Sequence, residues 1–197
     1  MKTRLFGIEI SFSFWFFAVL LAVLVTGQEV LAFYFLLPVA IHELGHLVAM
    51  AAAGIRVERV AFRAFGIDIQ RSRSATASYG RELAIAVGGV AANFLTALLL
   101  YGFAFQSMRV ILLVSVNVAL GLFNSLPVGT LDGGQILQIL LTRWGSLETA
   151  ATVSRICSFF VLIPLFALSI LLLLRGTANV SLLVACVYLA CTVIFSS

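Results

Sequence analysis

Six long apolar segments constrain the fold of this chain more than any other feature of its sequence. Each is close to the roughly 20 residues that a helix needs to cross a bilayer. Hydrophobic residues make up 62% of the 197 residues, well above the roughly 45–50% of an ordinary globular domain. We therefore predict an all-α membrane protein with about six transmembrane helices in one domain, residues 1–197. The six segments cover 10–26, 30–53, 83–105, 109–126, 153–174 and 178–195.

The positions of the basic residues indicate how these segments are oriented. In a six-helix topology, Arg109 and Arg175 fall on one side of the membrane, and every other Lys and Arg falls on the opposite side. Because cytoplasmic loops carry an excess of Lys and Arg, we expect both termini and the 54–82 loop to be cytoplasmic. The net charge of +4 thus reflects topology, and nucleic acid is not an expected partner.

The longest polar stretch, residues 54–80, separates the second apolar segment from the third. Its β-branched and aromatic residues on both sides of Gly66 are typical of strands. We predict a short β-hairpin over 56–70 on the cytoplasmic side, between helices two and three. The alternative is an irregular basic loop held against anionic lipid head groups.

The motif HELGH, residues 42–46, lies inside the second apolar segment. A charged side chain at the centre of a membrane helix costs about 2.5–3.5 kcal/mol, and such residues usually mark a functional site. Residues four apart share one face of a helix, so His42 and His46 can bind one metal ion, with Glu43 beside it. Zinc metalloproteases use this arrangement, in which the glutamate is the general base.

A third ligand has to come from elsewhere in the fold, because catalytic zinc takes three protein ligands and keeps one position for water. The chain has no further histidine. Asp132 is our candidate, since it follows a segment that Pro127 and several glycines interrupt, and irregular backbone at membrane depth lines cavities. Whether 127–141 is a helix extension, a re-entrant element or a short separate helix stays open.

These residues resemble the site-2 protease family of intramembrane zinc metalloproteases. The resemblance is carried by HELGH and by N-x-x-P-x-x-x-L-D-G-G at 124–134. It implies one Zn²⁺ held by His42, His46 and Asp132, with Glu43 as the catalytic residue. Gly88-Gly89-Val90-Ala91-Ala92-Asn93 looks like the family's G-P-x-x-N segment, with Val90 in place of proline.

Two asparagines in these segments have two open interpretations. Asn93 and Asn124 either position the substrate, as the resemblance implies, or form interhelical hydrogen bonds. Val90 is one departure from the family pattern, and another is Val128-Gly129-Thr130, where members often carry a second proline.

The resemblance also implies an activity: hydrolysis of a peptide bond in or near a transmembrane segment of a membrane-protein substrate, for regulated intramembrane proteolysis. The chain looks like a small prokaryotic member without an evident PDZ or CBS domain, located in the cell membrane and open to regulation by partner membrane proteins. The alternatives are an inactive adaptor that binds membrane segments and a zinc transporter. An extended substrate could add as a strand to the edge of the predicted hairpin.

Overall fold

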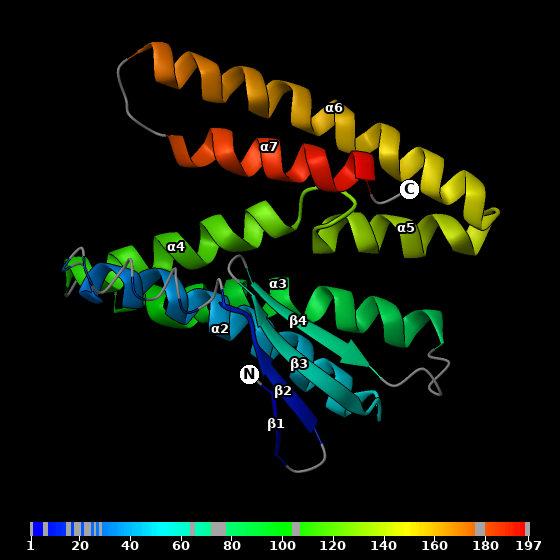
Figure 1. The fold of residues 1–197 in the computed structure, drawn as a ribbon, viewed down its shortest axis with the longest axis horizontal. Helices are drawn as coiled ribbons and strands as arrows, with labels where there is room; N and C mark the ends of the chain where they lie inside the picture. The colour runs from blue at the N-terminus through cyan, green and yellow to red at the C-terminus, as the bar shows by residue number, and fades with distance from the viewer. Residues whose placement is uncertain are drawn as a thin grey trace. The chain divides into compact units, whose positions relative to one another are not determined.

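The computed structural model describes residues 2–5, 8–14, 17, 21, 25, 27, 29–63, 66–71, 78–103, 107–175 and 180–195 (Figure 1). The chain divides into two compact units, residues 1–121 and 122–197. That these make one functional membrane domain stays a prediction. The elements are β1 (Lys2–Leu5), β2 (Ile8–Phe12), α2 (Glu29–Ala52), β3 (Val57–Arg63), β4 (Gly66–Arg71), α3 (Tyr79–Tyr101), α4 (Met108–Asn124), α5 (Asp132–Trp144), α6 (Leu147–Leu174) and α7 (Val180–Phe195).

Three of the described helices are long and apolar enough to cross a membrane. They are Ala32–Ala52 within α2, Tyr79–Tyr101 (α3) and Leu147–Leu174 (α6), with mean hydropathies of 1.6, 2.2 and 2.8. The apolar helices Met108–Asn124 and Leu182–Phe195 are shorter. A membrane protein is therefore supported, whereas the number of six spans stays a prediction.

The first predicted span, 10–26, was wrong at its start. Residues 8–12 form the strand β2. The sequence Ile-Glu-Ile-Ser-Phe alternates apolar and polar side chains, which is the periodicity of a strand. Most of the remaining residues of that span lie outside the described part of the chain.

The described strands form one sheet in the order β1-β2-β3-β4 (Figure 1). The predicted hairpin is present as the antiparallel pair β3 and β4, between α2 and α3 in the sequence. Its cytoplasmic location stays a prediction. The sheet is larger than the predicted hairpin, because β1 pairs antiparallel with β2 and β2 pairs parallel with β3. Parallel pairing joins segments far apart in the sequence, so local patterns do not reveal it.

A β-bulge fixes which side of β3 faces the helices. Successive strand residues point to opposite faces of a sheet, so a regular strand would place Val57 on the same face as Arg59. The register shift between these two residues pairs Val57 with Arg71 instead, and this moves its side chain to the face of Ile69. Val57 and Ile69 both pack against a buried cluster from the end of α2 and the start of α3: Met50, Ile55 and Ile85.

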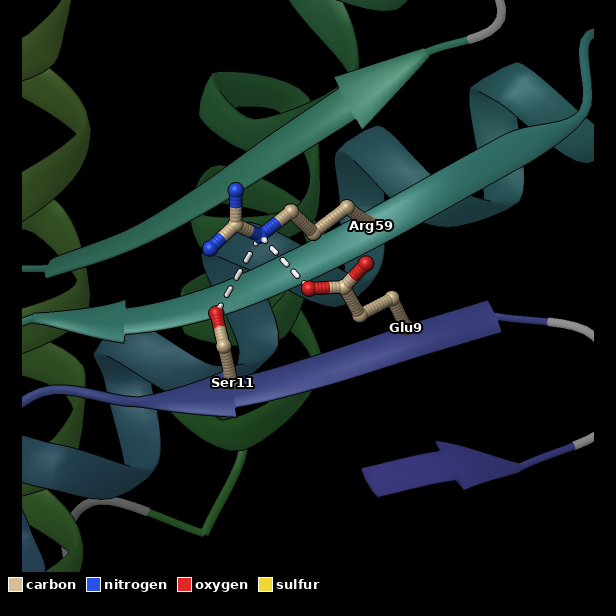
Figure 2. A network of polar contacts seen from close by, with 3 residues as sticks. All are labelled: Glu9, Ser11 and Arg59. Atoms are coloured by element: carbon tan, nitrogen blue, oxygen red, sulfur yellow. Dashed lines mark hydrogen bonds and ion pairs between the residues drawn. The ribbon is translucent and has the colours of Figure 1, made fainter. Parts of the chain in front are cut away.

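The opposite face of the sheet carries a polar network (Figure 2). Glu9 and Arg59 are partners in the parallel register of β2 and β3. Arg59 Nε donates a hydrogen bond to Ser11 Oγ at 3.3 Å and lies 3.6 Å from Glu9 Oε1. The two faces thus separate a polar side from a side that packs on α2 and α3.

The second unit is built around α6 and α7. Its apolar core joins Val128 and Leu131, from the segment that precedes α5, to Leu162 of α6 and to Leu189 and Val193 of α7. Residues 127–141 are not an extension of α4, because α5 is a helix of 13 residues that begins at Asp132. At about 1.5 Å per residue it extends for about 20 Å, which is shorter than the roughly 30 Å hydrocarbon core of a bilayer.

Candidate metal centre

His42 and His46 lie on one face of α2 with their Nε2 atoms 3.3 Å apart. The ring centroids are separated by 4.9 Å and the ring planes cross at 84°. Zinc bound tetrahedrally at about 2.0–2.1 Å from nitrogen requires its ligand atoms to be about 3.3–3.4 Å apart. The two imidazoles therefore already have the spacing of ligands to one zinc ion.

A backbone carbonyl fixes the orientation of the second imidazole. His46 Nδ1 lies 2.8 Å from the carbonyl oxygen of Ile85 in α3. Since a carbonyl oxygen can only accept, Nδ1 carries the proton and donates it, which leaves the lone pair of Nε2 for a metal. Hydrogen bonds of this kind are the usual support of metal-binding histidines.

Gly89 of α3 packs directly against both imidazoles. A Cβ added at Gly89 would collide with His46 Nε2 and would lie 2.8 Å from His42 Nε2. His42 is buried, with 5% of its surface exposed. The absence of a side chain at Gly89 therefore leaves the space that the two rings occupy.

Two further glycines bring the backbones of α2 and α3 together. A Cβ on Gly45 would collide with the carbonyl oxygen of Gly88, and a Cβ on Gly88 would lie 2.7 Å from the carbonyl oxygen of Gly45. Ala49 and Ala92, each four residues further along, line the same contact. Gly45 within HELGH is thus a packing residue. This role was not predicted from the sequence, although two small residues spaced by four are a known signal of close helix packing in membranes.

Glu43 follows His42 in α2 and is partly exposed. One residue turns a helix by about 100°, so Glu43 projects from a position adjacent to the face of the two histidines. Glu43, the predicted catalytic residue, therefore lies next to the histidine face of α2.

Asp132 is the first residue of α5 and is buried, with 7% of its surface exposed. The positive end of the helix dipole favours a carboxylate at this position. The next two residues are glycines for a steric reason. A Cβ on Gly133 would collide with the carbonyl oxygen of Ser125, and a Cβ on Gly134 would collide with that of Val128. The segment before α5 therefore folds back onto the first turn of this helix.

Internal hydrogen bonds keep this segment in a tight conformation. The backbone N–H of Val128 donates to the carbonyl oxygen of Leu126 at 2.7 Å, and that of Leu131 donates to Val128 at 2.8 Å. Val128 itself is fully buried. Pro127 and the glycines thus form an ordered turn that ends at Asp132.

Among the described residues, His42 and His46 of the first unit and Asp132 of the second each offer one atom that could bind a metal. The two asparagines differ in their surroundings. Asn93 is fully buried in α3, one turn after Gly89, and neither polar atom of its side chain has a hydrogen-bond partner among the described residues. Asn124 is the last residue of α4 and is half-buried.

Comparison with known proteins found similarity to peptidases. Residues 107–168 match the model of Peptidase family M50. The structure is similar to that of the site-2 protease from Methanocaldococcus jannaschii, with a TM-score of 0.69 and 19% sequence identity, over 96% of this chain and 91% of that protein. The resemblance to the site-2 protease family is confirmed. No curated protein sequence matches the chain.

The two comparisons support different parts of the resemblance. The segment that matches Peptidase family M50 contains Asn124 and Asp132 but not HELGH. The structural similarity extends over nearly the whole chain and shows the site-2 protease fold. Together they support an intramembrane metalloprotease, and the histidine pair contributes the metal-binding geometry.

Proposed function

We propose that this chain is an intramembrane zinc endopeptidase that hydrolyses a peptide bond in or near a transmembrane segment of its substrate. One observation carries the proposal: two imidazole Nε2 atoms 3.3 Å apart in a helix that is long and apolar enough to cross a membrane. A charged and polar motif at such a depth is costly and marks a functional site.

In this proposal His42, His46 and Asp132 hold one Zn²⁺ per chain. The donor set fits, because two nitrogens and one carboxylate oxygen are ligands that catalytic zinc uses in other hydrolases. The buried position of Asp132 and the fixed tautomer of His46 support this assignment. When bound, zinc would lower the pKa of a water molecule and polarise a carbonyl group.

Glu43 is the proposed general base and acid. Its carboxylate would take a proton from the attacking water and later pass that proton to the nitrogen of the leaving amine. Glu43 follows His42 in the helix, and this position supports the role because it puts the carboxylate next to a proposed metal ligand.

Asn93 is a proposed substrate-positioning residue. A helical side chain leans toward the N-terminus of its helix, so the amide of Asn93 leans toward Gly89, against which the two imidazoles pack. Its N–H groups would donate to the carbonyl oxygen of the bond that is cut. Asn124, at the end of α4, is proposed for the same function on the strength of the motif it shares with Asp132.

The substrate has to be extended at the cut bond, because backbone carbonyls inside an intact helix are hydrogen-bonded and shielded. β1 and β4 are the edges of the described sheet, and a substrate strand could add to one of them. Proline substitutions along β4 that preserve the fold but leave cleavage unchanged would remove this part of the proposal.

The proposed setting is the cell membrane of a prokaryote, with several spans and cytoplasmic termini. The substrate is a membrane protein cut for regulated proteolysis, and other membrane proteins could control access to the site. The sign of the loop charges supports the orientation, and the family resemblance supports the setting.

The test is cleavage of a panel of single-span reporter proteins by the purified chain with zinc. Glu43→Gln should abolish cleavage while keeping stoichiometric zinc, because the amide cannot accept a proton but leaves the ligands intact. Glu148→Gln, at an exposed position in the first turn of α6, is the matched control and should cleave like the wild type.

Other outcomes would favour the alternatives. Stoichiometric zinc without cleavage of any reporter, combined with capture of intact membrane segments, would indicate an inactive adaptor. Zinc flux in proteoliposomes would indicate a transporter.

A further inference from the structure

Ser158 of α6 binds the turn that leads to Asp132. Its Oγ accepts a hydrogen bond from the backbone N–H of Gly129 at 2.9 Å and donates one to the carbonyl oxygen of Ser154 at 2.7 Å. The carbonyl oxygen of Pro127 is 3.5 Å away. Ser158 has no exposed surface. Its hydroxyl donates its hydrogen within α6 and accepts a hydrogen bond from the turn.

The hydrogen bond belongs to a continuous face of α6. Ser154, Ser158 and Leu162 are spaced by four and are all buried, with 5%, 0% and 4% of their surfaces exposed. Leu162 contacts the apolar cluster that contains Val128 and Leu131. The turn is therefore fixed on α6 by apolar contact on both sides of Gly129 and by one hydrogen bond at Gly129 itself.

We propose that Ser158 is a positioning residue for Asp132, which rests on the function proposed above. Only two residues separate Gly129 from Asp132, so a shift of the turn moves the carboxylate with it. Partners that orient a metal ligand typically change metal affinity about 10-fold to 100-fold when they are removed. Ser158 would thus set how tightly the centre holds its metal without touching that metal.

The first experiment compares Ser158→Ala with Ser169→Ala by titrating the purified full chain with zinc in competition with a chelator. Ser169 is the matched control: it is also fully buried in α6, but its hydroxyl donates to Phe166 in its own helix. We expect about 10-fold to 100-fold weaker zinc binding for Ser158→Ala alone. The absorption spectrum of bound cobalt(II) should change as well, because the ligand geometry changes.

Equal zinc affinity and an unchanged cobalt spectrum in Ser158→Ala would overturn the inference. So would equal weakening in Ser169→Ala, since that would reflect general destabilisation. If wild-type protein binds neither metal, the proposed function itself fails. If the wild type binds both metals and Ser158→Ala binds them equally well, the proposed function stands and the inference alone is lost.

A second pair of variants removes the same hydrogen bond from the turn, in case Ser158→Ala does not fold. Gly129→Pro lacks the N–H donor, whereas Gly129→Ala keeps it, and the added Cβ would lie 3.8 Å from Ser158 Oγ, an ordinary contact. Zinc binding should weaken in the proline variant only. Equal affinities in the two variants would contradict the role of Ser158.

Discussion

The histidine pair and Asp132 lie in two regions whose local geometry arises in different ways. His42 and His46 need only a regular helix, because a spacing of four places them on one face. Asp132 needs an irregular turn in which Gly133 and Gly134 pass close to backbone carbonyls. The first region is specified by periodicity, whereas the second is specified by backbone contacts.

This difference predicts how each region responds to substitution. A helical ligand pair can lose its geometry while the helices stay folded, because only side chains need to move. A ligand at the end of a turn cannot be displaced alone, because the obstacle to any added atom is backbone. Metal binding and folding should therefore be separable in α2 and α3 but coupled around Asp132.

The largest effect on metal binding alone is expected from Gly89→Ala. The new methyl group would occupy the space of the two imidazoles, so we expect zinc affinity to fall by up to about 100-fold with little change in thermal stability. Chelator competition and thermal unfolding in detergent measure the two quantities.

Its neighbour Gly88 is the control, because a methyl group there meets the backbone of Gly45 instead. Gly88→Ala should cost about 1–3 kcal/mol of stability through overpacking. If both variants lost stability and zinc together, the proposed separation in this region would be wrong.

The second prediction concerns Gly133→Ala and Gly134→Ala. Both would force the turn away from α5, because the colliding atoms are carbonyl oxygens of Ser125 and Val128. We expect a loss of about 1–3 kcal/mol in stability together with weaker zinc binding, measured in the same two assays. Normal stability with weakened zinc binding would show that Asp132 can move independently, as the histidines do.

The metal-binding motifs of the two regions could be predicted from the sequence, but the contacts that support them could not. HELGH and the interrupted segment before Asp132 were recognisable because charge and proline are rare inside apolar segments. The contacts of Gly89 and Ser158 were not, since they depend on which helices become neighbours. Small residues and serines occur throughout such chains, and their identity alone does not reveal a partner.

Helix boundaries were missed for a related reason. α6 begins at Leu147, six residues before the predicted start at 153, because Ser146 caps it by accepting from the N–H of Thr149 at 3.2 Å. A hydropathy window detects the apolar part of a helix and overlooks a polar first turn that contains Glu148. The number of strands in the sheet was underestimated because β2 pairs with a strand more than 40 residues away.

The third prediction tests whether α3 also contributes a hydrogen-bond donor to catalysis, in addition to the space for the two metal-binding histidines. Asn93→Ala should lower kcat about 100-fold to 1000-fold, as expected for loss of one donor to the reacting carbonyl, and leave zinc affinity unchanged. Asn117→Ala is the control, because Asn117 is equally buried but donates to Leu113 in its own helix. Equal loss of kcat in both variants would reduce Asn93 to a packing role.

The smallest effect is expected in the sheet, which belongs to the same unit as α2 and α3 but carries no proposed ligand. Arg59 and Glu9 are 34% and 29% exposed and 3.6 Å apart, and such pairs contribute about 0.2–1 kcal/mol. Arg59→Ala and Glu9→Gln, alone and combined, should yield a coupling free energy in that range by thermal or denaturant unfolding. Zinc affinity should not change, because the histidine spacing comes from α2 itself and the space for the two rings comes from Gly89 of α3. A drop in zinc affinity would mean that the sheet also positions the histidines.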